Sequence, residues 1–180
     1  MIIPNIQPAS DLVLQHGTYI LISEAAKKPP HLSLLVEGKI FSLSVKGPQL
    51  EFPLEKQLKL IKIKKINALF IKLDTSIYII GNQLFKEAEN NTLKFSKIEI
   101  GIATCLSPIK DFCARVFDMD VSNIDFVFDL LPILYKKKYI SACYHYNMEK
   151  ILINNSFHFQ KYTMQDIYES VTKFQPADIL

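Results

Sequence analysis

The chain has 180 residues, of which 49% are hydrophobic, and a formal net charge of +3. This length and composition allow one sizeable core without staples, so we expect a single globular domain over residues 1–180. The mild charge is spread along the chain, so no nucleic-acid partner is expected. No window approaches the roughly 18 apolar residues of a membrane span, so no transmembrane segment is expected.

The three cysteines have no paired spacing, and residues 1–6 are too short for the apolar part of a signal peptide. A reducing cytoplasm is therefore the expected location, although a protein exported without a cleaved signal would have the same pattern. Cys143 and His145 would share one face of a strand, but two ligands are too few for a closed zinc site. We expect neither a metal nor a cofactor.

The first half of the chain predicts a sheet. Residues 1–15 form an extended lead-in with a short helical turn after Ser10, and a polar loop over residues 24–30 contains two prolines. Glu37-Gly38 joins two strands in a hairpin. The expected strands cover residues 17–23, 31–36, 39–45, 49–54, 56–66, 68–73 and 76–80.

The densest lysine cluster falls on the fifth of these predicted strands. It is interleaved with leucine and isoleucine, and we interpret it as the solvated side of the strand. A patch for phosphate or a membrane surface is the alternative, and nucleic-acid binding is a more distant one because the spacing scatters the charges. The cluster consists of Lys59, Lys62, Lys64 and Lys65.

The second half mixes helices with a few strands. A short helix is expected over residues 82–93, and Ser122 with Asp125 resembles a capping box that begins a helix kinked at Pro132. Thr163 and Asp166 predict the cap of a last helix. Two or three strands are expected among residues 140–146, 149–153 and 156–162. Together the elements predict an α+β fold, with a central antiparallel sheet and a few packed helices.

The segment 101–117 joins a strand-like run to an amphipathic helix, with Cys105 at the junction. Ile109, Phe112 and Val116 recur at helical spacing. A thiol in the first turn of a helix lies near unpaired backbone N–H groups, which lower its pKa and make it nucleophilic. The alternative interpretation of Cys105 is a small buried residue of the core.

The order of these parts resembles a known family. His31 opens HLSLLVEGKIFSLSVKG, which resembles the histidine strand, Gly-Lys turn and returning strand of NlpC-type papain-like enzymes. Because the histidine precedes the cysteine, the pattern is similar to the circularly permuted branch that includes lecithin:retinol acyltransferase-like enzymes and bacterial and poxviral relatives. In that branch the cysteine begins a helix similar to CLSPIKDF. The resemblance covers residues 17–117 and implies a permuted papain-like arrangement.

The resemblance implies a thiol hydrolase or acyltransferase acting on an amide, peptide or thioester bond. Cys105 would be the nucleophile and His31 the base. The third polar residue would fall on the returning strand, where the chain has Ser42 in place of the usual histidine, asparagine or acidic residue. His145 and His158, on late strands, are rival candidates for the base.

A second hypothesis is a non-catalytic α+β module that binds another protein, with Cys105 merely packed. Five glycines and many Ile, Leu and Phe residues suit a rigid core better than an active site built from loops. The absence of tryptophan and the abundance of Ile, Lys and Asn are typical of an AT-rich genome, as in a bacterium, a phage or a virus.

Overall fold

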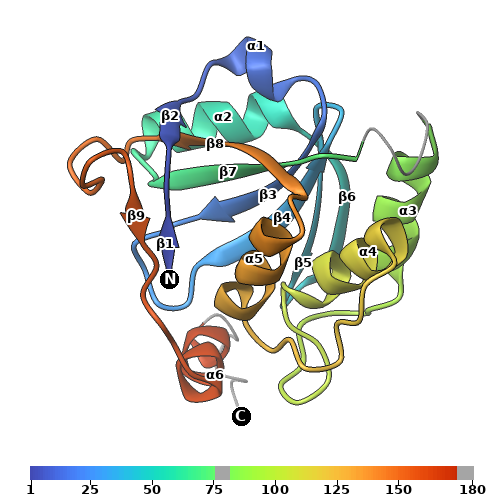
Figure 1. Ribbon diagram of the computed structural model, residues 1–180. Coiled ribbons are helices and arrows are strands. Elements are labelled where there is room, and N and C mark those ends of the chain that lie inside the picture. The colour runs from blue at the N-terminus through green and yellow to red at the C-terminus, as the bar shows by residue number, and fades with distance from the viewer. Residues whose placement is uncertain (76–81, 174–180) are drawn as a thin grey trace.

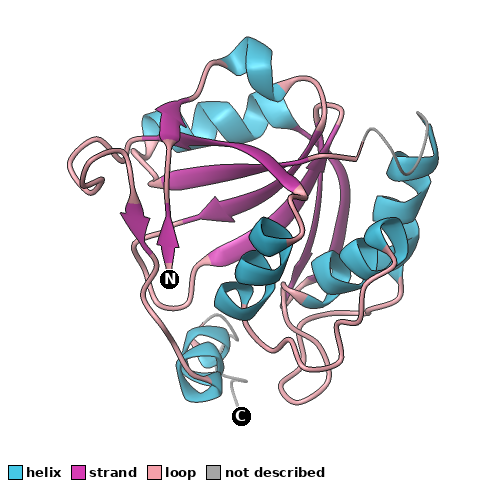
Figure 2. Ribbon diagram, in the orientation of Figure 1, coloured by secondary structure: helices cyan, strands magenta, loops and turns pink. Residues whose placement is uncertain are grey.

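The computed structural model of the protein describes residues 1–75 and 82–173. Within these residues the chain forms six helices, a seven-stranded mixed sheet and a two-stranded sheet (Figures 1 and 2). The predicted α+β class is confirmed. The predicted strand over residues 76–80 lies outside the described residues.

The large sheet is antiparallel at every pairing except one edge, where β2 runs parallel to β8. A second, two-stranded sheet pairs β1 (Ile2–Ile3) with β9 (Phe157–His158) and ties the N-terminus to a late segment. The sheet predicted as antiparallel is therefore mixed. Its strand order is β2 (Ile6–Pro8), β8 (Ile140–Tyr146), β7 (Ala68–Leu73), β3 (Thr18–Ser23), β4 (His31–Val36), β5 (Lys39–Ser44) and β6 (Gly47–Pro53).

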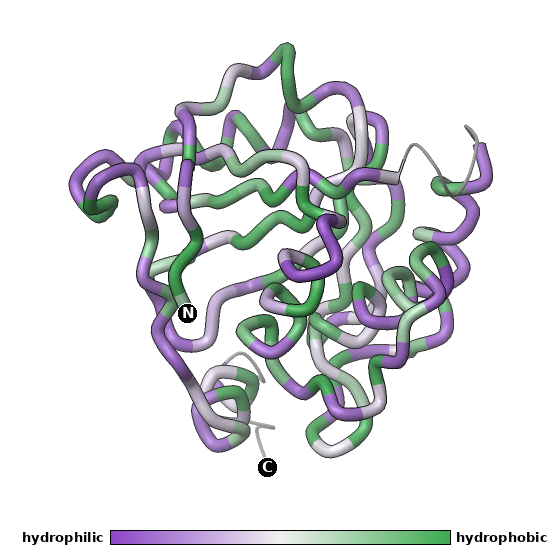
Figure 3. Tube along the Cα trace, in the orientation of Figure 1, coloured by the Kyte–Doolittle hydropathy of each residue, from purple (hydrophilic) through white to green (hydrophobic). Residues whose placement is uncertain are grey.

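Both faces of the sheet are covered, because alternate side chains of its central strands enter two separate hydrophobic clusters. On β3, Ile20 and Ile22 join the larger cluster, whereas Tyr19 and Leu21 join the smaller one. Apolar stretches accordingly follow the central strands in Figure 3. The smaller cluster is closed by α1 (Asp11–Leu14) and α2 (Leu54–Ile63), and the larger one by α3 (Asn82–Leu93), α4 (Ser107–Phe117) and α5 (Val127–Lys136).

The prediction of a strand over residues 56–66 is wrong, because most of this segment belongs to helix α2. Leu54, Leu58 and Ile61 are the buried residues of this helix, at i, i+4 and i+7. That spacing has the period of a helix, whereas the alternation of lysine and isoleucine suggested a strand. Lys59 and Lys62 are exposed on α2, so the lysine cluster lies on the solvated side of a helix and the turn after it.

Two predicted strands near the C-terminus are also corrected. Residues 149–153 form a turn, since the amides of Ile151 and Leu152 both donate to the Met148 carbonyl, at 2.8 and 3.0 Å. The strand predicted over residues 156–162 is reduced to the two residues of β9. Positive φ angles at Asn154 and Asn155 bend the chain between these segments, which prevents an extended run.

The predicted starts of α1, α3 and the last helix are confirmed, whereas those of α4 and α5 were misplaced. Helix α6 (Met164–Thr172) has the expected capping box of Thr163 and Asp166. Helix α5 begins later than residues 122–125, and the Asp129 carboxylate accepts a hydrogen bond from the Phe126 amide at 3.1 Å. Helix α4 begins at Ser107, two residues after Cys105.

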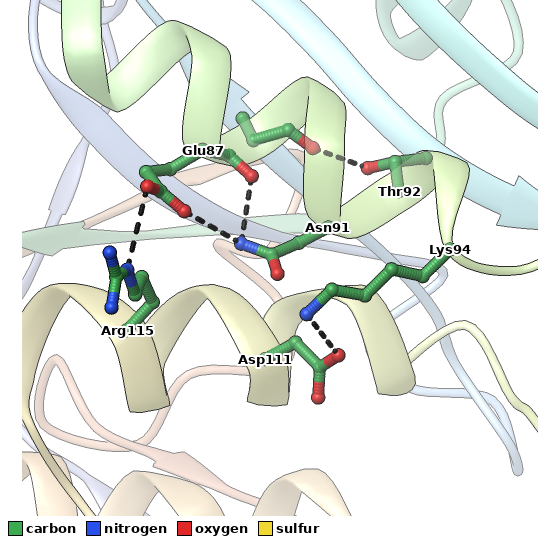
Figure 4. A network of polar contacts seen from close by, with 7 residues as sticks. Glu87, Asn91, Thr92, Lys94, Asp111 and Arg115 are labelled. Carbon is green, nitrogen blue, oxygen red and sulfur yellow. Dashed lines mark hydrogen bonds and ion pairs between the residues drawn. The ribbon is translucent and has the colours of Figure 1, made fainter.

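Polar contacts join α3 to α4 on their outer surfaces (Figure 4). Arg115 Nε lies 3.6 Å from Glu87 Oε1, and Lys94 Nζ lies 3.0 Å from Asp111 Oδ2. These surface pairs contribute little free energy individually, and α4 is held on the sheet mainly by its buried apolar side chains.

Candidate functional site

A cavity of about 520 Å³ lies where the start of β4, the loop before α4 and helix α6 meet. Its walls are mainly apolar and include Leu32, Leu106 and Val171. Both the predicted nucleophile and the predicted base line it. The polar and titratable residues that line this cavity are Glu24, His31, Ser44, Lys46, Thr104, Cys105, Asp125, Tyr162 and Ser170.

Cys105 is held in a tight turn rather than in a helix. The Ser107 amide donates to the Thr104 carbonyl at 3.0 Å, and the Thr104 amide donates to Ser107 Oγ at 2.9 Å. The Leu106 amide donates to Thr104 Oγ1 at 3.2 Å. Because both side chains of the turn bond to its backbone, Cys105 has a defined position beside the cavity and is partly exposed.

The prediction that the pKa of Cys105 is lowered is wrong. Burial raises the pKa of the Cys105 thiol to about 11, and the backbone amides of Leu32 and Cys105 offset only part of this effect. The helix starts two residues too late for its first turn to contain the thiol. At neutral pH the thiol is therefore protonated, and a reaction there would need a base that takes its proton.

His31 is the first residue of β4 and reaches the cavity from the end of the sheet. Burial lowers the pKa of His31, and the charge of Glu24 opposes this effect in part. The imidazole is therefore neutral at neutral pH and able to accept a proton. Within residues 1–75 and 82–173, no hydrogen bond joins its ring to the thiol of Cys105.

Ser42, the third predicted catalytic residue, is not among the residues that line the cavity. Its hydroxyl lies 3.3 Å from Gln49 Oε1 and donates a hydrogen bond to it. Ser44 does line the cavity, but its hydroxyl donates to the Gly47 carbonyl at 3.1 Å. The structure thus brings Cys105 and His31 to one cavity and leaves Ser42 outside it.

Sequence reasoning missed several residues of the cavity, among them Glu24 and Tyr162. Glu24 comes directly after β3, where a positive φ of 56° turns the chain. Tyr162 is 6% exposed and packs against the rings of Phe126 and Phe128, with centroids 5.4 and 5.2 Å away. Burial raises the pKa of Tyr162, so its hydroxyl stays protonated. The signal for Tyr162 was its position just before the capping box of α6.

The part of the chain that the structure describes contains no cluster of three or more His, Cys, Asp or Glu side chains arranged to hold a metal ion. Cys143 and His145 do share a face of β8, where Tyr135 Oη lies 3.0 Å from Cys143 Sγ. Neither residue lines the cavity, so His145 is not placed to act on Cys105. None of the described helices combines the length and apolar character that a membrane crossing requires.

Comparison of the chain with protein-family models, with curated proteins and with solved structures gives no match.

Proposed function

We propose that the protein is a thiol hydrolase or acyltransferase that acts on an amide, peptide or thioester bond, with Cys105 as nucleophile and His31 as base. One observation carries this proposal: two residues that the sequence pattern selected from distant segments line the same cavity. The apolar walls would accept an apolar acyl group or side chain next to the scissile bond. The permuted papain-like arrangement is part of the same proposal.

The protonation states favour a general-base reaction over a preformed ion pair. His31 would take the proton of the Cys105 thiol while Sγ attacks the carbonyl carbon and forms a C–S bond. The bond to the leaving group then breaks, and the leaving group receives that proton from His31. Water or another acyl acceptor, deprotonated by His31, would attack the thioester, and the proton returns to Cys105.

The backbone near the thiol supports this sequence of steps. The amides of Leu32 and Cys105 lower the pKa of the thiol against the effect of burial, so they stabilise negative charge on Sγ. Leu32 directly follows His31 along β4. The strand that carries the base therefore also carries a group that stabilises the thiolate as it forms.

The test is acylation of the protein by p-nitrophenyl acetate and by a longer-chain p-nitrophenyl ester, followed by intact and site-resolved mass spectrometry. We expect an acyl adduct on Cys105 that is lost in Cys105→Ala and forms about 10²- to 10⁴-fold more slowly in His31→Ala. Matched controls are Cys113→Ala and His16→Ala, which remove a cysteine and a histidine outside the cavity. An adduct rate unchanged in His31→Ala would contradict the proposal.

A second candidate function is a non-catalytic module that binds an apolar side chain of a partner protein in the cavity. The absence of a Cys105 to His31 hydrogen bond in the described chain, together with the raised pKa of Cys105, favours it. In that case neither ester would acylate Cys105 in any variant. Cys105→Ala would leave partner binding intact, whereas Ile167→Asp would abolish it by placing a charge in the apolar wall at a partly buried position.

A further inference from the structure

Helix α2 and the turn after it carry a concentration of positive charge. The segment 54–65 contains five lysines and one glutamate, whereas the rest of the chain has one more acidic than basic residue. The positive net charge of the protein therefore arises from this segment alone. Its lysines are Lys56, Lys59, Lys62, Lys64 and Lys65, and all five are exposed.

Most of this charge is not neutralised by neighbouring carboxylates. Lys62 Nζ lies 2.7 and 2.6 Å from the two carboxylate oxygens of Asp11, and this contact joins α2 to α1. Within residues 1–75 and 82–173, none of the other four lysines of the segment forms an ion pair. Four exposed positive charges remain, and they would attract a partner of negative charge.

Apolar side chains are exposed beside these lysines. Leu12 on α1 is 77% exposed and Ile63 on α2 is 68% exposed, and Val13 and Leu60 are exposed as well. Leu60 and Ile63 are three positions apart, so they share a side of α2, and it is not the side that packs on the sheet. We call the surface formed by these four residues and the five lysines the α1–α2 face. Apolar side chains that gather on a surface among polar ones mark contact with a partner or a membrane.

We propose that the α1–α2 face binds the surface of an anionic membrane, with α2 lying in the interface between headgroups and acyl chains. Lysine ammonium groups attract anionic headgroups, and each one near such a surface strengthens binding about fivefold. The exposed leucine and isoleucine side chains would enter the acyl boundary, as in the amphipathic helices of peripheral proteins. The lysine stems can extend along apolar surface while their ammonium groups stay among the headgroups.

The chemistry of the face favours a lipid surface over other partners. Two copies of the chain in a symmetric contact would bring the same lysines together, and like charges repel. Nucleic-acid sites commonly use arginine and stacked aromatic side chains, whereas the segments 10–13 and 54–65 contain neither. A phosphate backbone would also leave Leu12 and Ile63 without apolar contacts.

The α1–α2 face and the cavity lie on opposite sides of the large sheet (Figure 1). Helices α1 and α2 close the smaller hydrophobic cluster, whereas Leu32 and Leu106 in the cavity wall belong to the larger one. Binding to a membrane through the α1–α2 face would therefore leave the cavity uncovered. The inference goes beyond the proposed function and does not depend on any reaction at Cys105.

The experiment measures co-sedimentation of the protein with vesicles of phosphatidylcholine, alone or with about one third phosphatidylserine. We expect binding to the anionic vesicles only, and weaker binding as the salt concentration rises. The double variant Lys56→Gln with Lys59→Gln should bind about ten- to thirtyfold more weakly. Ile63→Gln should bind about three- to tenfold more weakly, because it removes apolar contact and leaves the charge unchanged. Absence of parent binding to the anionic vesicles would overturn the inference.

Matched controls remove the same groups from other surfaces. The double variant Lys97→Gln with Lys161→Gln removes two exposed lysines from the loops before α4 and α6. Ile102→Gln removes an isoleucine that is 72% exposed in the first of these loops. Both controls should bind like the parent. An equal loss of binding in the control lysine variant would mean attraction by net charge alone, and it would overturn the inference.

A second measurement follows the apolar contact directly. The chain contains no tryptophan, so a single introduced tryptophan reports its own surroundings. The emission of Ile63→Trp should move to shorter wavelength with the anionic vesicles, because the indole leaves water for the membrane interface, whereas that of Ile102→Trp should not change. An unshifted Ile63→Trp emission, or full binding by Ile63→Gln, would indicate a purely electrostatic contact, as with an acidic protein or a nucleic acid. Either result would overturn the proposed lipid contact.

Discussion

The backbone amide of Leu32 lies against the thiol of Cys105 and lowers its pKa, opposing the effect of burial. This contact joins the beginning of strand β4 to the loop that precedes α4. It brings together two segments far apart in the sequence, and it fixes where His31, the neighbour of Leu32, meets the cavity. The reactivity of Cys105 is consequently a property of two segments rather than of one helix.

Alkylation by iodoacetamide should distinguish Cys105 from Cys113. Burial raises the pKa of Cys105 to about 11 and that of Cys113 to about 12, and Cys113 is fully buried. Since the thiolate is the reactive form, the Cys105 rate should climb steadily from pH 7 toward pH 11, with Cys113 slower throughout. Site-resolved mass spectrometry measures both rates in one sample. A Cys105 rate that levels off below pH 8 would contradict the raised pKa.

Glu24→Gln should lower the pKa of His31 further, because the charge of Glu24 is what raises it against burial. The pKa of His31 is lower in the folded protein than in the unfolded chain, where it is near 6.5. The unfolded chain therefore binds a proton more readily than the folded protein, and the free energy of unfolding falls as the pH drops through and below that value. An NMR titration of His31 measures the shift. Glu37→Gln is the control, because the Glu37 carboxylate lies 3.5 Å from His16 Nδ1 instead.

The helical assignment of α2 predicts a large destabilisation at one isoleucine and a small one at another two positions along the chain. Ile61 is fully buried, whereas Ile63 is 68% exposed. Ile61→Ala should reduce the free energy of unfolding by about 2–5 kcal/mol, and Ile63→Ala by less than about 0.5 kcal/mol. On a strand the two side chains would share a face and respond alike. Urea denaturation of the two variants therefore tests helix against strand directly.

Helix α6 should be less protected against hydrogen exchange than α4 and α5, which have more buried residues. Val171 is its one buried residue within the described chain, whereas Ile167, Ser170 and Val171 together form part of the cavity wall. Few buried contacts mean a low free energy of local opening, and that opening would uncover Cys105. Exchange measured by mass spectrometry should protect β3, all of whose residues are buried, far longer than α6. Equal protection of both segments would argue against an opening wall.

Much of the fold was predictable from local pattern. The apolar and β-branched runs at residues 17–23, 31–36 and 68–73 became β3, β4 and β7, because buried strands are specified by composition within a few residues. The capping box of Thr163 and Asp166 was also predictable, because its two residues lie only three positions apart in the sequence. The prediction failed for the segment that became α2, because its lysines and isoleucines fit both the two-residue period of a strand and the period of a helix.

The sequence by itself determined the α+β class, since strand composition and helix periodicity are local properties, whereas the family resemblance singled out His31 as the partner of Cys105. Only the tertiary structure decided which groups surround them. Packing of the loop before α4 against β4 buries the thiol and raises its pKa, a desolvation effect that no sequence window contains. Strand register, likewise, left Ser42 beside Gln49 and outside the cavity.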